Sequence, residues 1–163
     1  TTEELKKHAT DYQGVTKEMA SAASATAEAM DAAANAETAA NKAEADMKKA
    51  SEAWGAFCQD AKHLAEEAAG CKSFADALQK LPDDPTKQAE AAKAIAELNK
   101  VAWKSDEGKA NAKKVTDALT ASQKSITDAK AAEAKAKAAQ AQVAAAEKKE
   151  GTTIDALNKF CQE

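Results

Sequence analysis

The residues of this chain with the most informative chemistry are its three cysteines, Cys58, Cys71 and Cys161. Three cysteines in 163 residues are either three thiols or one disulfide and one remaining thiol. On one straight helix, the 13 residues from Cys58 to Cys71 would span about 20 Å, which is too far for a disulfide. A disulfide therefore requires that the chain folds back after Gly70, or that the C-terminal segment returns to the same end. We expect one disulfide, and its pairing stays open.

The two histidines and the paired carboxylates do not form the pattern of a catalytic or metal site. His63 lies 5 residues after one cysteine and 8 before another, which is not the spacing of zinc ligands. We expect His8 and His63 to be solvated on a helix surface. Glu66–Glu67 is typical of a solvated helix end, and Asp83–Asp84 of a helix cap. With no Ser/His/Asp arrangement and no glycine-rich phosphate loop, we expect no catalytic residue, no metal, no cofactor and no enzymatic activity.

A heptad pattern predicts the element that positions most of these residues. Two rows of positions begin at Leu5 and His8 and end near Cys71, and apolar residues fill 18 of their 20 positions. Alanine alone can produce such a row, so the large apolar residues are the stricter test. Eight of the nine lie on the rows, with Met30 beside them: Leu5, Tyr12, Val15, Met19, Met47, Trp54, Phe57 and Leu64. The pattern predicts a long helix with an apolar seam, in which Trp54 and Phe57 pack in the core rather than bind a ligand.

Composition limits the classes of function. Alanine accounts for 46 of the 163 residues, which favours long helices with thin apolar layers, because one buried methyl group contributes only about 0.8 kcal/mol. The formal net charge is −4 and arginine is absent, so nucleic-acid binding is not expected. No run of about 18 apolar residues is present, so no membrane-spanning helix is expected.

Glycine, proline and capping residues divide the chain, which we expect to be a single domain over residues 1–163. Gly70 and Gly151 predict helix ends, and Asp84 followed by Pro85 predicts a helix start. The expected elements are a long first helix over 2–69, a connector over 71–83, a second helix over 84–104, a third helical stretch over 106–150 and a C-terminal turn over 152–163. The expected fold is all-α: an elongated antiparallel helical bundle, in essence a long coiled-coil hairpin, three-helical in part, with a small head around the connector.

Charge and large side chains predict how the hairpin pairs. Residues 2–70 carry 13 acidic residues and 7 lysines, a net charge of −6, whereas residues 104–150 carry 10 lysines and 7 acidic residues, a net charge of +3. No lysine flanks the seam of the first helix, so that helix should prefer the return stretch of its own chain to a copy of itself, and the isolated chain should be a monomer. The residue pairs expected at the same level centre the turn near Leu78: Trp54 with Trp103, Met30 with Ile126, Val15 with Val143, and Leu5 with Ile154.

The return stretch has an apolar face of its own, which changes register once. It runs through Val115, Leu119, Ser122, Ile126 and Ala129, and continues after a slip as Ala132, Ala136, Ala139, Val143 and Ala146. The slip predicts a local change of helix winding. Beyond Gly151, the large residues Ile154, Leu157 and Phe160 are expected to form the face of the final turn.

The layout and the alanine-rich segments of this chain resemble the glutamic acid/alanine-rich surface-coat proteins of African trypanosomes, which share their architecture with the variant surface glycoproteins. The resemblance covers nearly the whole chain and rests on stretches such as ASAASATAEAMDAAANAETAANKAEADMKKA and DAKAAEAKAKAAQAQVAAAEKKEG. It implies a helical ectodomain on the extracellular side of the cell surface, held by a lipid (GPI) anchor at its C-terminus. The chain ends Phe160–Cys161–Gln162–Glu163 without an anchor signal, so the anchor comes from the resemblance alone.

The function that the resemblance implies is that of a non-enzymatic structural coat protein, which forms a rod-like protective layer on a parasite surface. Its partners would be neighbouring coat proteins, and its only membrane contact would be the lipid anchor. Two alternatives stay open: an intracellular coiled-coil scaffold, and a surface receptor that binds a ligand at the head. The redox state of the cysteines helps to separate the first alternative from a surface protein.

Overall fold

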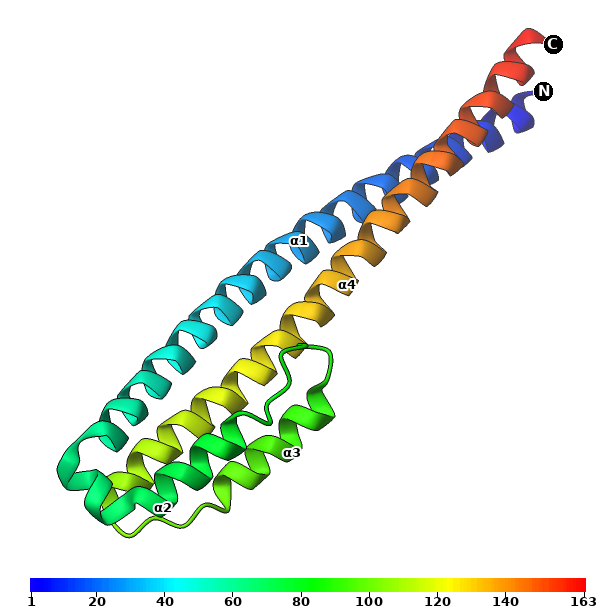
Figure 1. Ribbon diagram of the computed structural model, residues 1–163. Coiled ribbons are helices and arrows are strands. Elements are labelled where there is room, and N and C mark those ends of the chain that lie inside the picture. The colour runs from blue at the N-terminus through cyan, green and yellow to red at the C-terminus, as the bar shows by residue number, and fades with distance from the viewer. The chain divides into compact units, whose positions relative to one another are not determined.

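The structure, a computed structural model, describes all residues from Thr1 to Glu163. It consists of four α-helices without strands: α1 (Thr2–Gln59), α2 (Ala61–Leu78), α3 (Gln88–Asn99) and α4 (Asp106–Gln162). The two long helices, α1 and α4, run antiparallel and pack on each other, which confirms the expected all-α helical hairpin (Figure 1). No helix combines the length and the apolar character needed to cross a membrane.

The chain divides into two compact units. Unit 1 consists of residues 1–35 and 130–163, and is therefore an antiparallel pair formed by the first part of α1 and the last part of α4. Unit 2 consists of residues 36–129, and contains the rest of α1 and α4 together with α2 and α3.

Exposure along the long helices follows the heptad. Among the first 50 residues, every position of α1 that is not exposed lies on one of the two predicted rows, from His8 to Ala50. The predicted register slip of α4 is also present, since the less exposed positions pass from Ala129 to Ala132 and continue with the expected spacing to Ala146. The expected helix end at Gly151 is wrong: α4 continues through it, and the seam continues at Glu150, Thr153, Leu157 and Phe160.

The axial register of unit 1 differs from the expected one. The ring centroids of His8 and Phe160 are 5.0 Å apart, and the Nζ atom of Lys149 lies 3.3 Å from a carboxylate oxygen of Glu18. The pairing of Val15 with Val143 is therefore displaced by about 10 residues, as is that of Leu5 with Ile154. The physical reason is that the hairpin does not turn at Leu78, because α2 and α3 form a separate folded-back pair between the end of α1 and the start of α4 (Figure 1).

The core of unit 2 is built from large side chains. Phe74 of α2, Leu98 of α3 and Val115 of α4 are at most 1% exposed, and Trp54 and Phe57 of α1 are buried with them. The predicted core role of these two aromatic residues is therefore confirmed. The buried face of α3 consists of Ala91, Ala94, Ile95 and Leu98.

Three expected boundaries around the connector are wrong. The first helix ends at Gln59 rather than at residue 69, and α2 passes through Gly70, which has helical rather than positive φ. Most of the expected connector 71–83 is therefore helix. Asp84 does not cap α3: its carboxylate accepts hydrogen bonds from the backbone N–H and the hydroxyl of Thr86, which closes a turn before the helix starts at Gln88.

Candidate functional site

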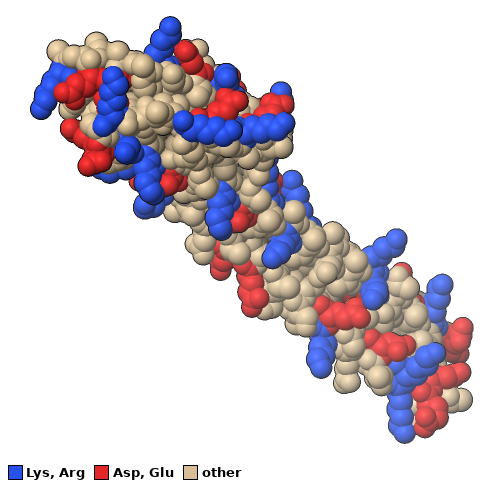
Figure 2. Space-filling view, turned by 90° about the horizontal axis from the view of Figure 1, so that it is seen from below, with Lys and Arg blue, Asp and Glu red and all other residues tan.

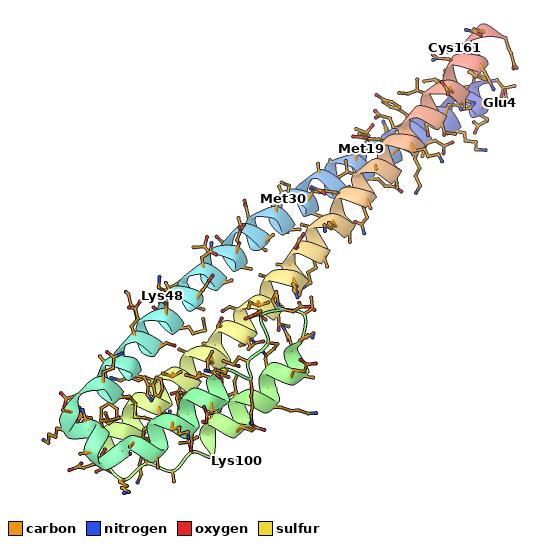
Figure 3. The ribbon with its side chains drawn as sticks, in the orientation of Figure 1. Glu4, Met19, Met30, Lys48, Lys100 and Cys161 are labelled. Carbon is orange, nitrogen blue, oxygen red and sulfur yellow. A yellow bond between two sulfur atoms is a disulfide. The ribbon has the colours of Figure 1, made fainter.

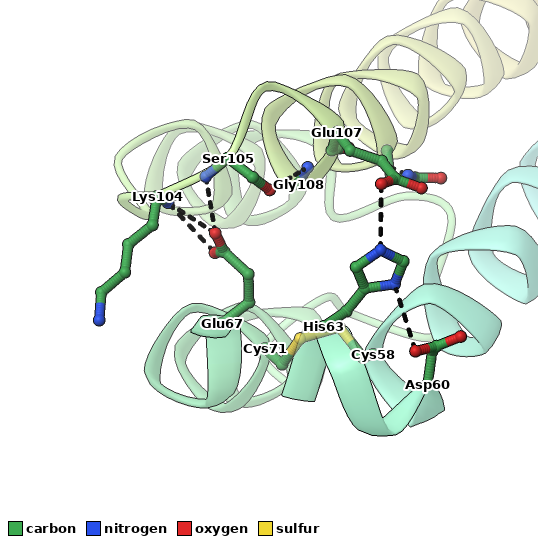
Figure 4. Close-up of a disulfide and its surroundings, with 10 residues drawn as sticks. Cys58, Asp60, His63, Glu67, Cys71, Lys104, Ser105, Glu107 and Gly108 are labelled. Carbon is green, nitrogen blue, oxygen red and sulfur yellow. Dashed lines mark hydrogen bonds and ion pairs between the residues drawn. A yellow bond between two sulfur atoms is a disulfide. The ribbon is translucent and has the colours of Figure 1, made fainter. Parts of the chain in front are cut away.

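Cys58 of α1 and Cys71 of α2 form a disulfide, with their Cα atoms 5.9 Å apart (Figure 4). The chain does fold back, as a bridge between these two cysteines requires, but it does so at Asp60 and not after Gly70. Asp60 has an extended backbone (φ −65°, ψ 125°), and its carboxylate accepts a hydrogen bond of 2.9 Å from the N–H of Lys62, which starts α2. Cys161, in the last turn of α4, is a free and exposed thiol.

A buried carboxylate lies next to the disulfide. Glu67 of α2 is 2% exposed and accepts hydrogen bonds from the backbone N–H groups of Lys104, at 2.8 and 3.2 Å, and Ser105, at 2.7 Å. These N–H groups immediately precede α4, where a negative charge is favoured by the helix dipole and by the unpaired N–H groups of the first turn. The expected solvated position of Glu67 is therefore wrong. Figure 4 shows these hydrogen bonds of its carboxylate to the backbone at the start of α4, which they stabilise.

Two glycines make room for the indole ring of Trp103, between α3 and α4. A Cβ atom placed on Gly70 would lie 3.0 Å from the ring carbon Cε3 of Trp103, and one placed on Gly108 would also lie 3.0 Å from it. Both distances are shorter than ordinary van der Waals contacts, so any larger residue would displace the ring. Sequence reasoning assigned Gly70 to a helix end, whereas its role is this close approach.

His63 connects α2 to the start of α4. Its ring stacks on Phe57 with centroids 4.2 Å apart, and its Nε2 atom lies 3.0 Å from a carboxylate oxygen of Glu107. The Nδ1 atom lies 4.0 Å from a carboxylate oxygen of Asp60. The side chain is only 18% exposed, so the expected solvated position of His63 is wrong. His8 is partly exposed and contacts Phe160 instead.

The aromatic rings join these contacts into one assembly. Trp54 packs on Phe74 with centroids 4.8 Å apart, and Trp103 contacts Phe57 edge-on at 6.3 Å and Phe74 edge-on at 5.7 Å. Trp103 lies in the non-helical segment between α3 and α4, so the expectation of a helix that continues to residue 104 is wrong. We call this assembly the disulfide cluster; it consists of Trp54, Phe57, Cys58, His63, Glu67, Gly70, Cys71, Phe74, Trp103 and Gly108.

The disulfide cluster holds helices together. The covalent bond joins α1 to α2, the Glu67 carboxylate joins α2 to the start of α4, and the stacked rings fill the space between them. No group of three or more His, Cys, Asp or Glu side chains is arranged to hold a metal ion. The side chains of the cluster that have acid–base or redox chemistry each have a structural partner: Cys58 is bonded to Cys71, His63 contacts Glu107, and Glu67 accepts hydrogen bonds from Lys104 and Ser105.

Only part of this cluster could be found from the sequence. The cysteines, Trp54 and Phe57 were recognised from residue type and heptad position. Glu67, Gly70 and Trp103 were not, because their contacts join residues about 33 to 38 positions apart. The one local sequence signal in this region is Ser105, which marks the start of α4. Its hydroxyl accepts a hydrogen bond of 3.0 Å from the N–H of Gly108, as an N-cap serine does. No family model, no curated protein and no solved structure matches the chain.

Proposed function

We propose that this chain is a non-enzymatic structural protein of a cell-surface coat, exposed on the extracellular side and held by a lipid anchor at its C-terminus. The observation that carries the proposal is the disulfide between Cys58 and Cys71 within a helical hairpin. Structural disulfides form and persist in oxidising compartments, and are rare in the cytosol. The disulfide therefore supports a surface coat protein over an intracellular coiled-coil scaffold.

The use of the polar side chains also supports a structural role. The carboxylate of Glu67 accepts hydrogen bonds at the start of α4, and His63 is stacked on Phe57 beside Glu107. The buried residues of unit 1 are the seam alanines Ala136, Ala139 and Ala146, whose small side chains allow the two helices to approach closely there. A coat protein needs a fold that is stable outside the cell and narrow enough to stand beside many copies of itself. The structural use of Glu67 and His63 supports the first requirement, and the close approach of α1 and α4 supports the second.

The test is to locate the protein on cells that express it. An antibody against the chain should label intact, non-permeabilised cells, and phosphatidylinositol-specific phospholipase C should release the labelled protein into the medium. Alkylation of the native protein before reduction should modify Cys161 alone, and alkylation after reduction should modify all three cysteines. Intact-protein mass spectrometry measures both states and also detects the lipid.

An antibody against a cytosolic protein provides the control for cell integrity. Labelling that requires permeabilisation, together with three free thiols in the native protein, would overturn the surface assignment and favour the intracellular scaffold. Surface labelling that phospholipase does not release would keep the coat function and exclude the lipid anchor.

A further inference from the structure

A single residue separates α1 from α2. Asp60 is the only residue between the two helices, and its φ of −65° is already that of a helix, whereas its ψ of 125° is extended. Helical backbone hydrogen bonds are present on both sides of it: the N–H of Asp60 donates to the carbonyl of Ala56, and the N–H of Leu64 donates to the carbonyl of Asp60. A change of ψ at this one residue would therefore join α1 and α2 into one helix.

The apolar pattern of the sequence fits a joined helix as well as the bent one. The two heptad rows of α1 continue into α2 without a break, through Ala61, Leu64, Ala68, Cys71, Ala75 and Leu78. In the bent form, Leu64 is 47% exposed although it lies on these rows. The local feature that favours the bend is the carboxylate of Asp60, which accepts a hydrogen bond from the N–H of Lys62.

The other end of the α2–α3 pair is also attached through a non-helical segment. Residues 100–105 join α3 to α4, and Figure 3 labels Lys100 at the start of this segment. The last two residues of the segment donate backbone hydrogen bonds to Glu67. Because α2 and α3 pack on each other, we treat residues 61–99 as one body, which we call the flap. Its two attachments lie at the same end of unit 2 (Figure 1).

The disulfide is the only covalent restraint on the position of the flap. The Cα atoms of Cys58 and Cys71 are 5.9 Å apart, whereas a joined helix would place them about 20 Å apart. A disulfide cannot span that distance, so the oxidised protein cannot straighten at Asp60. The burial of Phe74 and the hydrogen bonds of Glu67 also hold the flap, but these contacts are non-covalent and can open and form again.

We propose that the disulfide is a redox-controlled lock, and that its reduction allows the flap to move about its two attachments while α1 and α4 remain paired. Charged side chains lie over much of the surface seen in Figure 2, with uncharged areas between them. Movement of the flap adds a different kind of surface, because it uncovers the buried side chains of Trp54, Phe57 and Val115. The inference goes beyond the coat function and does not depend on it.

The reductant is a dithiol, which supplies two electrons and two protons. Cys58 is partly exposed and Cys71 is buried, so an incoming thiolate attacks the Sγ atom of Cys58. The bond between the two sulfur atoms breaks, and Cys71 leaves as a thiolate that takes a proton from water. The second thiol of the reductant loses its proton and attacks the mixed disulfide. This step releases Cys58, which is protonated, and converts the reductant into a disulfide.

The experiment measures the distance across the bend in single molecules by fluorescence energy transfer. A donor and an acceptor dye are attached at the exposed positions Glu52 of α1 and Asp76 of α2, through genetically encoded ketone side chains that leave the native cysteines free. In a joined helix, the 24 residues between these positions span about 36 Å. The oxidised protein should give one population of high transfer efficiency. Dithiothreitol should add a second population of low efficiency.

Two variants test the hinge at Asp60. Ala61→Pro removes an N–H that the joined helix needs and favours an extended backbone at Asp60, whereas proline is well accepted at the first position of α2. The low-efficiency population should be absent from the reduced Ala61→Pro protein. Asp60→Ala removes the cap of α2 and leaves the joined helix intact. The low-efficiency fraction of the reduced protein should therefore rise about fivefold.

Cysteine variants separate the lock from other effects of the reductant. Cys58→Ser combined with Cys71→Ser, measured without dithiothreitol, should reproduce the two populations of the reduced protein. Cys161→Ser is the matched control, and without dithiothreitol it should keep the single high-efficiency population. Circular dichroism of each sample should show that the helices remain folded.

Three results would overturn the proposal. A single high-efficiency population in the reduced protein and in the Cys58/Cys71 variant would show that non-covalent contacts alone keep the flap closed. A loss of helical circular dichroism on reduction would show that the whole chain unfolds instead of the flap. Equal low-efficiency fractions in reduced Ala61→Pro and in the reduced native protein would exclude Asp60 as the hinge. None of these results bears on the coat function, which antibody labelling of intact cells tests separately.

Discussion

The two units use the same helical repeat but differ in what fills it. In unit 2, the residues that are at most 2% exposed include Phe74, Leu98 and Val115, and a disulfide crosslinks the same region. In unit 1, the only buried residues are Ala136, Ala139 and Ala146. A buried methyl group contributes about 0.8 kcal/mol, and a large apolar side chain several times as much. The comparison teaches that a regular seam specifies pairing, whereas side-chain volume decides how much each level contributes to stability.

The largest effect is expected in the core of unit 2. Phe74→Ala should reduce the free energy of unfolding by about 3–5 kcal/mol, because the ring is 0% exposed and its removal leaves a cavity. Val143→Ala, at a partly exposed seam position of unit 1, should cost about 1 kcal/mol. Urea unfolding followed by circular dichroism measures both changes. Similar losses at the two positions would show that the core is not concentrated in unit 2.

The disulfide is the second difference between the units. Replacing Cys58 and Cys71 together by serine should cost about 3 kcal/mol, since the crosslink restricts the unfolded chain over a loop of 13 residues. Cys161→Ser, in unit 1, should leave the unfolding free energy unchanged because this thiol is exposed and unpaired. The same urea titrations test both variants. A measurable loss in Cys161→Ser would point to an unrecognised contact at the end of α4.

The buried carboxylate of unit 2 should contribute about 2 kcal/mol. Glu67→Ala removes the acceptor for the N–H groups of Lys104 and Ser105 and leaves them unpaired in a buried site. The adjacent Glu66→Ala removes an exposed carboxylate of the same charge and should have little effect. Hydrogen exchange provides a second measurement: the amide of Ser105 should exchange faster only in the Glu67 variant. Equal exchange rates of the Ser105 amide in the two variants would contradict the hydrogen bonds of Glu67 at the start of α4.

Replacing glycine by alanine should destabilise the protein at some positions and stabilise it at others. Gly70→Ala and Gly108→Ala each place a Cβ atom 3.0 Å from the ring of Trp103, and should cost about 1–2 kcal/mol. Gly14→Ala and Gly151→Ala, in unit 1, meet open space and should stabilise their helices by up to about 1 kcal/mol. Tryptophan fluorescence, to which Trp54 and Trp103 both contribute, should respond to the first pair alone, because both indole rings lie in unit 2. Stabilisation by Gly70→Ala would mean that the indole ring lies elsewhere.

The smallest effect concerns an exposed carboxylate of unit 2, for comparison with the buried Glu67. The Nζ atom of Lys42 donates a hydrogen bond of 2.8 Å to Asp46, which lowers the pKa of that carboxyl and raises the pKa of Lys42. The contribution of Asp46 is present above its unfolded pKa and is lost as the pH falls through its lower folded pKa. That of Lys42 is present below its unfolded pKa and is lost as the pH rises through its higher folded pKa.

Carboxyl NMR titration measures this small effect. In Lys42→Ala, the pKa of Asp46 should rise toward that of an ordinary aspartate, with little change in stability because both side chains are exposed. Lys48→Ala, an exposed lysine elsewhere on α1, is the control and should not move it. An unchanged Asp46 titration in Lys42→Ala would exclude the ion pair in solution.

The amino-acid sequence by itself determined the parts of this protein that depend on periodicity. The seam of α1, the register slip after Ala129 and the core positions of Trp54 and Phe57 follow from spacing, because side chains that repeat every three and four residues must share one helix face. The opposite net charges of the two stretches also predicted the pairing of α1 with α4, and an exposed ion pair joins Glu18 to Lys149 across it.

The tertiary structure alone decided where the helices bend and which distant groups meet. The heptad continues through Asp60 to Leu64, yet the chain folds back at Asp60 and leaves Leu64 47% exposed. No glycine or proline marks this bend, and its local feature is Asp60, which caps the start of α2. The fold-back brings Phe74 into the core, closes the Cys58–Cys71 bridge and places Glu67 at the start of α4. A repeating pattern records which face of a helix is apolar, but contacts between residues far apart in the chain decide where that helix must end.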